Sequence, residues 1–128
     1  MILPNQGKYS DYWIFEGILF FVYHEIPFLD LKIAKAVLKE RLEFQDGRSF
    51  PILCETNGIQ DASKSARDFL ALEGSILADA VAIVEKRIVA QSMIHLYLRR
   101  NQPIIPTEVF NNSLDAQKYL YNFLNANP

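Results

Sequence analysis

Ser63 stands in a polar segment whose residue types suit regulated chemistry. Lys64 and Arg67 follow it within one helical turn, and Asn57 and Asp61 precede it. A phosphoryl group on this hydroxyl would bring roughly two negative charges to both cations and to the positive end of a helix. The simpler alternative is a serine that only caps the helix, which contributes about 1 kcal/mol and is the more common role. Both interpretations stay open from the residues alone.

Other side chains with reactive groups have sequence surroundings that favour structural roles. Cys54 lies within an apolar run, and a buried thiol of that kind is unreactive. His24 and His95 stand outside ligand spacings such as HExxH or CxxC, so we expect no metal and no cofactor. Glu55 is the best-placed carboxylate near Ser63, as a base or as a partner of Lys64, although most such groups are only solvated or paired. Without a GxSxG, GxGxxG or P-loop pattern, we predict a protein that is not an enzyme.

The segment from Phe50 to Leu70 must position the polar residues around Ser63. Pro51 begins an apolar run, which is a position that a strand tolerates for proline. Asn57-Gly58 is a turn signal, and helical spacing begins directly after Ser63. A helix that starts beyond the end of a parallel strand is where α/β sheets place ligands and partner surfaces. We therefore expect the functional surface at this helix start.

Length and composition limit the class of protein. The 128 residues are 50% hydrophobic and 22% charged, which is typical of one folded domain with its own core. A formal net charge of -2 argues against nucleic-acid binding. The lone Cys54, with no apparent leader segment, favours a reducing, cytoplasmic location. The longest apolar run, Ile18 to Tyr23, is too short to span a membrane.

Hydrophobic periodicity and turn residues predict the remaining elements. In chain order they are a loose arm over residues 1–8, a β-hairpin over 12–23, a helix between Asp30 and Asp46, a strand after Pro51, a helix from Ser63 to about Glu73, a strand over 78–84, a helix over 87–100, a strand over 107–110 and a last helix capped by Asn112 or Ser113. Strict alternation after the hairpin predicts an α/β fold with a mixed, mostly parallel sheet, ordered ββαβαβαβα, in a single domain over residues 9–128.

The helix over 87–100 is predicted to be amphipathic. Its predicted buried stripe consists of Val89, Met93, Leu96 and Tyr97.

Several runs, taken in their order and spacing, carry a resemblance to a known family. They are Ile52-Leu53-Cys54-Glu55-Thr56-Asn57-Gly58-Ile59, Ser63-Lys64-Ser65-Ala66-Arg67-Asp68-Phe69, Ala80-Val81-Ala82-Ile83-Val84, Pro106-Thr107-Glu108-Val109-Phe110 and Asp115-Ala116-Gln117-Lys118-Tyr119-Leu120. Together they resemble the STAS domain (sulphate transporter and anti-sigma-factor antagonist). The resemblance is strongest to the small bacterial proteins described as STAS-like or stage II sporulation protein AA-like, and it covers most of the chain from the hairpin onward.

In the anti-sigma-factor antagonists an Asp-Ser-Ser-Gly type turn starts the second helix, and a partner kinase phosphorylates one of its serines. Here the matching stretch is Asp61-Ala62-Ser63-Lys64, in which Ser63 matches the second serine and Lys64 replaces the glycine. The resemblance implies a non-enzymatic regulatory or adaptor domain that binds a protein partner, such as an anti-sigma factor or kinase, through the start of this helix. Asp61, Lys64, Arg67 and Asn57 are the expected contact residues, and Ser63 is the candidate for phosphorylation.

Two alternatives to a partner-binding domain remain. The first is a carrier of a small apolar molecule or lipid, with a pocket between the helix over 87–98 and the aromatic residues of the hairpin. The second is a structural homodimer that buries those same aromatic residues, which include Trp13 and Phe21.

Overall fold

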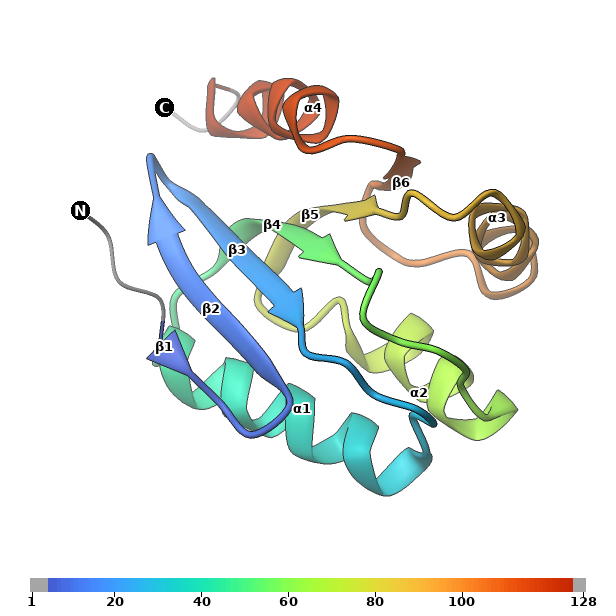
Figure 1. Ribbon diagram of the computed structural model, residues 1–128. Helices are drawn as coiled ribbons and strands as arrows, with labels where there is room; N and C mark the ends of the chain where they lie inside the picture. Colours follow the sequence, from blue (N-terminus) through green and yellow to red (C-terminus); the bar gives the residue numbers. More distant parts are fainter. Residues whose placement is uncertain (1–4, 126–128) are drawn as a thin grey trace.

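The computed structural model describes residues 5–125, which form one six-stranded sheet and four helices (Figure 1). The elements are β1 (Asn5–Gln6), β2 (Ser10–Phe15), β3 (Ile18–Tyr23), α1 (Leu31–Gln45), β4 (Phe50–Glu55), α2 (Lys64–Glu73), β5 (Ala78–Val84), α3 (Ile88–Asn101), β6 (Thr107–Phe110) and α4 (Ser113–Asn125). Spatial order follows chain order; β1, β2 and β3 pair antiparallel, and β3 to β6 pair parallel. The predicted α/β architecture with a mixed, mostly parallel sheet is confirmed.

The helices cover both faces of the sheet. Helices α1 and α2 pack together on one face, while α4 packs on β4 and β5 from the other (Figure 1). Ala116 and Leu120 of α4 are fully buried against Leu53 and Ala82. Among residues 5–125, none of the helices combines the length and the apolar character that a bilayer crossing requires.

The predicted hairpin is present, and its reversal depends on two residues in the left-handed region. Glu16 has a φ of 51° and Gly17 a φ of 82°, which suits a two-residue hairpin turn. The strand that follows, β3, lies between β2 and β4, and five of its six residues are buried. An apolar strand of this kind is typical of the interior of a sheet and not of its edge.

The N-terminal prediction needs a correction. Asn5 and Gln6 form β1, with Asn5 opposite Tyr12 of β2, so this part of the expected loose arm is an edge strand of the sheet. Two residues carry too little periodicity to predict a strand, and pairing with β2 decides their conformation. Residues 1–4 of the predicted arm lie outside the described residues.

The helix caps follow the local sequence. Asp30 accepts a hydrogen bond from the backbone N–H of Ile33 at 2.8 Å, and Asp46 ends α1 in the left-handed conformation. Asn112 caps α4 by accepting from the N–H of Asp115 at 2.8 Å, which settles the choice between Asn112 and Ser113. The side chains of Asp30 and Asn112, and the backbone N–H of Asp46, satisfy backbone groups that a helix end leaves unpaired.

The predicted buried stripe of α3 is largely wrong. Val89, Met93 and Leu96 are 74%, 48% and 52% exposed, and no residue of α3 is fully buried. The helix packs on α2 and β6 and carries apolar residues on more than one side, so periodicity does not determine which side faces inward. The side that faces the sheet carries Ala90, Ile94 and Tyr97, at a distance that leaves a cavity.

Candidate functional site

The connection from β4 to α2 is longer than the tight turn that the sequence predicts. Residues 56–63 run beside residues 24–29, with bridges between Ile26 and Ile59 and between Leu29 and Ala62. At Gly58 a Cβ atom would overlap the backbone carbonyl groups of the neighbouring segment, so this close approach requires glycine. The paired segments carry the chain beyond the carboxyl ends of β3 and β4 before α2 begins.

Ser63 lies at the start of α2, as the sequence predicts. Its Oγ accepts a hydrogen bond from the N–H of Ala66 at 3.1 Å and lies 3.2 Å from the Oγ of Ser65. The side chain is half-buried. The capping role is confirmed, whereas phosphorylation of Ser63 stays a prediction.

The predicted contact residues around Ser63 point in different directions. Lys64 pairs with Asp68 at 2.7 Å, and the hydroxyl of Tyr97 donates to the same carboxylate at 3.0 Å. The hydrogen bonds from Lys64 and Tyr97 hold the pKa of Asp68 below its ordinary value. Asp61 is exposed and accepts from the N–H of Ala62. Lys64 therefore belongs to an exposed ion pair, in which water screens the charges.

Asn57 connects β4 to the segment after β5. Its Nδ2 donates to Glu55 at 3.2 Å, and its Oδ1 accepts from the N–H of Lys86 at 2.9 Å. These bonds tie two neighbouring strand ends together. Glu55 is thus engaged with Asn57, and Lys64 with Asp68.

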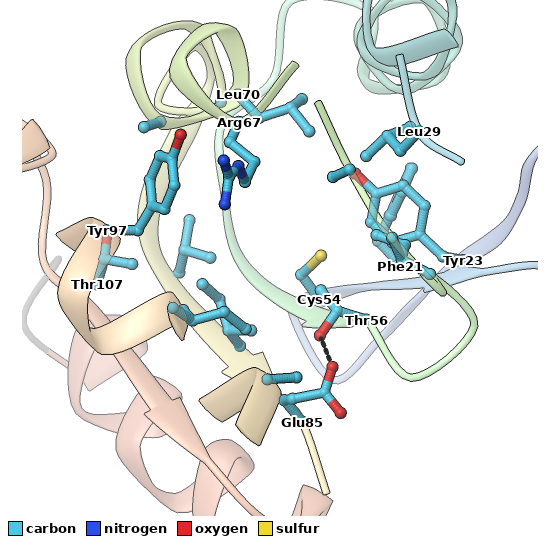
Figure 2. Close-up of a pocket in the computed structure, with 18 of the residues that line it drawn as sticks. Phe21, Tyr23, Leu29, Cys54, Thr56, Arg67, Leu70, Glu85, Tyr97 and Thr107 are labelled. Carbon is cyan, nitrogen blue, oxygen red and sulfur yellow. Dashed lines mark hydrogen bonds between the residues drawn. The ribbon is translucent and has the colours of Figure 1, made fainter. Parts of the chain in front are cut away.

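A cavity of about 320 Å³ lies between the sheet and the three helices α1, α2 and α3. Its lining is mainly apolar and comes from β3, β4 and β5 on one side and from the helices on the other (Figure 2). Representative lining residues are Phe21, Tyr23, Leu29, Ile52, Cys54, Leu70, Ile83, Ala90, Ile94 and Tyr97. The volume lies at the lower end of the range typical of small-molecule sites.

Arg67 extends from α2 into this cavity. Figure 2 shows its side chain between Tyr97 and Cys54, and its guanidinium carbon lies 4.7 Å from the centre of the Tyr97 ring. Its Nε is buried and has no hydrogen-bond partner among the described residues. Of the four predicted contact residues, Arg67 is the one that lines the cavity with an unpaired polar group.

Arg41 is a second arginine of the cavity, and the fold uses it differently. It is 5% exposed and donates to the side chain of Gln45 at 2.8 Å and to the carbonyls of Gly74 and Ile76 at 3.2 and 3.1 Å. Burial lowers its pKa. These bonds connect α1 to the end of α2, so Arg41 has a structural role.

Glu85 forms a buried ion pair at the end of β5. It is 1% exposed and accepts two hydrogen bonds from the guanidinium of Arg87, at 2.9 and 3.0 Å, and one from Thr56 at 2.9 Å (Figure 2). Burial raises the pKa of this carboxyl, but the bonds from Arg87 and Thr56 outweigh burial and hold it below its ordinary value. Glu85 therefore stays ionised and fully paired.

The remaining reactive side chains are placed as structural groups. Burial raises the pKa of Cys54 to about 12 and also raises the pKa of Tyr23, so both stay protonated at neutral pH. His24 lies 2.8 Å from a carboxylate oxygen of Asp11, and His95 is exposed. Within residues 5–125 no three His, Cys, Asp or Glu side chains gather into a group that could hold a metal ion.

Sequence reasoning missed three charged residues of the cavity: Arg41, Glu85 and Arg87. Glu85 directly follows the apolar run of β5, where a carboxylate at a strand end is a usable signal. In α1, Arg41 follows Val37 and Leu38 at helical spacing and so lies on the buried face, which the exposed lysines of this helix do not share. This spacing was a usable signal for Arg41.

A family model described as a domain of unknown function, DUF7793, matches residues 12–124. The chain belongs to the DUF7793 family. This DUF7793 chain is similar in structure to an uncharacterised protein of the DUF3478 family with a SpoIIAA-like fold, from Shewanella loihica PV-4. The TM-score is 0.59 at 13% identity, with 94% of this chain and 92% of that chain covered. The likeness confirms the predicted STAS-like fold and concerns the fold alone. No curated protein matches this DUF7793 sequence significantly.

Proposed function

We propose that this DUF7793 protein binds a small apolar molecule in the cavity between the sheet and helices α1, α2 and α3. The observation that carries the proposal is the cavity itself, about 320 Å³ with a mainly apolar lining. The proposal corresponds to the carrier function that the sequence left as an alternative to a partner-binding domain.

The position of α3 supports a binding role for this space. Protein interiors are packed as densely as organic crystals, so apolar side chains that face an unfilled space forgo packing contacts. Ala90 and Ile94 of α3 face the sheet across the cavity, and α3 contributes no fully buried residue. A bound apolar molecule would supply the contacts that α3 does not make with the sheet.

The polar groups at the cavity suit a mostly apolar occupant. Glu85 is paired with Arg87, and Arg41 donates to three protein acceptors, so these groups need nothing from a ligand. An apolar molecule can therefore enter without breaking their hydrogen bonds.

A neutral probe and a blocked cavity test the proposal. Octan-1-ol is titrated into the protein, and binding is followed by the amide resonances of the cavity residues. Replacing Ala90, which lines the cavity, with tryptophan should fill the space and abolish binding. The matched control is Val89→Trp, since Val89 is the neighbouring residue on α3 but is exposed.

The expected result is saturable binding to the wild type and to Val89→Trp, and none to Ala90→Trp, with all three proteins giving dispersed spectra. Absence of saturable binding to the wild type would refute the proposal. Equal binding by the two tryptophan variants would also refute it, because the molecule would then lie outside the cavity.

We also propose, as a second candidate, that the start of α2 binds a protein partner under control of a phosphate on Ser63. The observation in its favour is the half-buried Ser63 at the helix start, with Arg67 one turn away. Protein from native cells should then carry a phosphate adduct that Ser63→Ala lacks, and Ser63→Asp should change which protein is captured from lysate. Unmodified protein with an unchanged capture would contradict it.

Two further proposals rest on the sequence alone. A cytoplasmic location rests on the single Cys54. A homodimer built on the hairpin stays a prediction, although Phe20 and Phe21 of that hairpin are buried within the protein and Phe15 is its most exposed aromatic residue.

A further inference from the structure

We infer that the ligand of this cavity is a single-chain carboxylic acid of about eight carbons, whose carboxylate binds the guanidinium of Arg67. This inference rests on the proposed function and specifies the chemistry of its ligand.

The first argument is the unsatisfied donor of Arg67. Its Nε–H is buried and unpaired within residues 5–125, although a buried donor without a partner is costly and rare. The cation–π contact with Tyr97 uses none of the N–H donors of the guanidinium, so it leaves the Nε–H without a partner. The edge of an arginine, with Nε and one Nη side by side, matches the two oxygens of a carboxylate.

The second argument is the charge balance of the cavity lining. Its charged residues are Arg41, Asp61, Arg67, Glu85 and Arg87. The charges of Glu85 and Arg87 cancel within one ion pair, and the exposed Asp61 accepts from a backbone N–H. In the described part of the chain Arg41 and Arg67 form no ion pair. The cavity therefore has an excess of positive charge that an anionic ligand would neutralise.

The third argument is where Arg67 lies along the cavity. Arg67, Met93 and Tyr97 also line a second, smaller hollow of about 130 Å³, whose other residues include Lys64 and Arg100. Arg67 thus stands between an apolar space and a hollow edged by cations. An amphiphile fits this arrangement with its tail in the larger space and its acid group at Arg67.

The size of the cavity sets the length of the tail. At about 30 Å³ for a water-sized group, a volume of about 320 Å³ holds roughly ten non-hydrogen atoms. Octanoate has that number. A two-chain lipid would have to leave most of its apolar surface outside the cavity.

The test compares octanoate with octan-1-ol, which has the same chain and no charge. Both affinities are measured by calorimetry or amide chemical shifts at pH 7 for the wild type and for Arg67→Met, which keeps an unbranched apolar stem and removes the guanidinium with its charge. Arg99→Met is the control, because Arg99 is exposed on α3 and lines neither hollow.

For the wild type, octanoate should bind at least about tenfold more tightly than octan-1-ol, as one charge-assisted pair predicts. Arg67→Met should remove this preference and leave octan-1-ol unchanged, whereas Arg99→Met should keep it. Equal binding of acid and alcohol by the wild type, or a preference that survives Arg67→Met, would overturn the carboxylate assignment alone. If neither molecule binds the wild type, the proposed function itself fails.

Discussion

Arg41 and Arg67 reach the same cavity, yet the structure predicts a clear loss of stability for Arg41→Met and almost no change for Arg67→Met. Arg41→Met removes the donor for three acceptors: the side chain of Gln45 and the carbonyls of Gly74 and Ile76. Each lost bond to a partly buried acceptor costs about 1 kcal/mol, and removing a buried cation returns part of that cost. We expect a net loss of about 2 kcal/mol in the free energy of unfolding.

For Arg67→Met the contributions nearly cancel. The change removes the stacking on Tyr97, worth about 0.5 to 1 kcal/mol, and it also removes a buried donor that has no partner in the described chain. Without ligand, the variant should lie within about 0.5 kcal/mol of the wild type. An arginine that contributes to ligand binding and not to folding behaves in this way.

Urea unfolding followed by the fluorescence of the single Trp13 measures both free energies, and thermal unfolding provides a second reading. At about 4 °C per kcal/mol for a domain of this size, Arg41→Met should lower Tm by roughly 8 °C, and Arg67→Met should leave Tm nearly unchanged. If Arg67→Met destabilises the protein as much as Arg41→Met, Arg67 is a structural residue, and the argument from its unpaired Nε is refuted.

Three further predictions concern other residues of the site. The folded-state pKa of Glu85 lies below its ordinary value, so Glu85 stabilises the protein at neutral pH, and this contribution is lost as the pH falls through the folded-state pKa. Glu85→Gln should therefore lower the free energy of unfolding by about 2 kcal/mol at pH 7. Urea titrations should show that the difference between this variant and the wild type shrinks toward pH 3. With a pKa of about 12, Cys54 in the folded protein should react with a disulfide reagent at pH 8 far more slowly than a free thiol. Unfolding in urea should restore the rate of a free thiol. Equal rates in the folded and unfolded states would contradict the burial of Cys54. Gly58→Ala should lower Tm markedly, since a Cβ atom at this position overlaps backbone carbonyl groups. Gly47→Ala is the control for steric overlap, because a Cβ atom there meets no neighbour. The positive φ of Gly47 adds some backbone strain to the control variant.

Much of the fold was predictable because its signals are local. The turn at Glu16-Gly17 and the caps at Asp30 and Ser63 each act on backbone groups within a few residues. The site was predictable only in part. The sequence predicted Arg67 as a contact residue at the start of α2, but in the structure Arg67 turns toward the sheet, while Lys64 pairs with Asp68 on the surface.

By itself the sequence determined the order and ends of the helices and strands from α1 onward, and hence the α/β fold, since apolar spacing and capping residues act over short distances. Only the tertiary structure decided which side of α3 faces the sheet, because that helix is apolar on more than one side and its packing on α2 and β6 fixes its rotation. The same packing leaves the cavity open and Arg67 without a protein partner. The hydrogen bonds of Arg41 to Gly74 and Ile76, and the place of Arg67 opposite Tyr97, depend on residues distant in the chain, which local spacing does not specify.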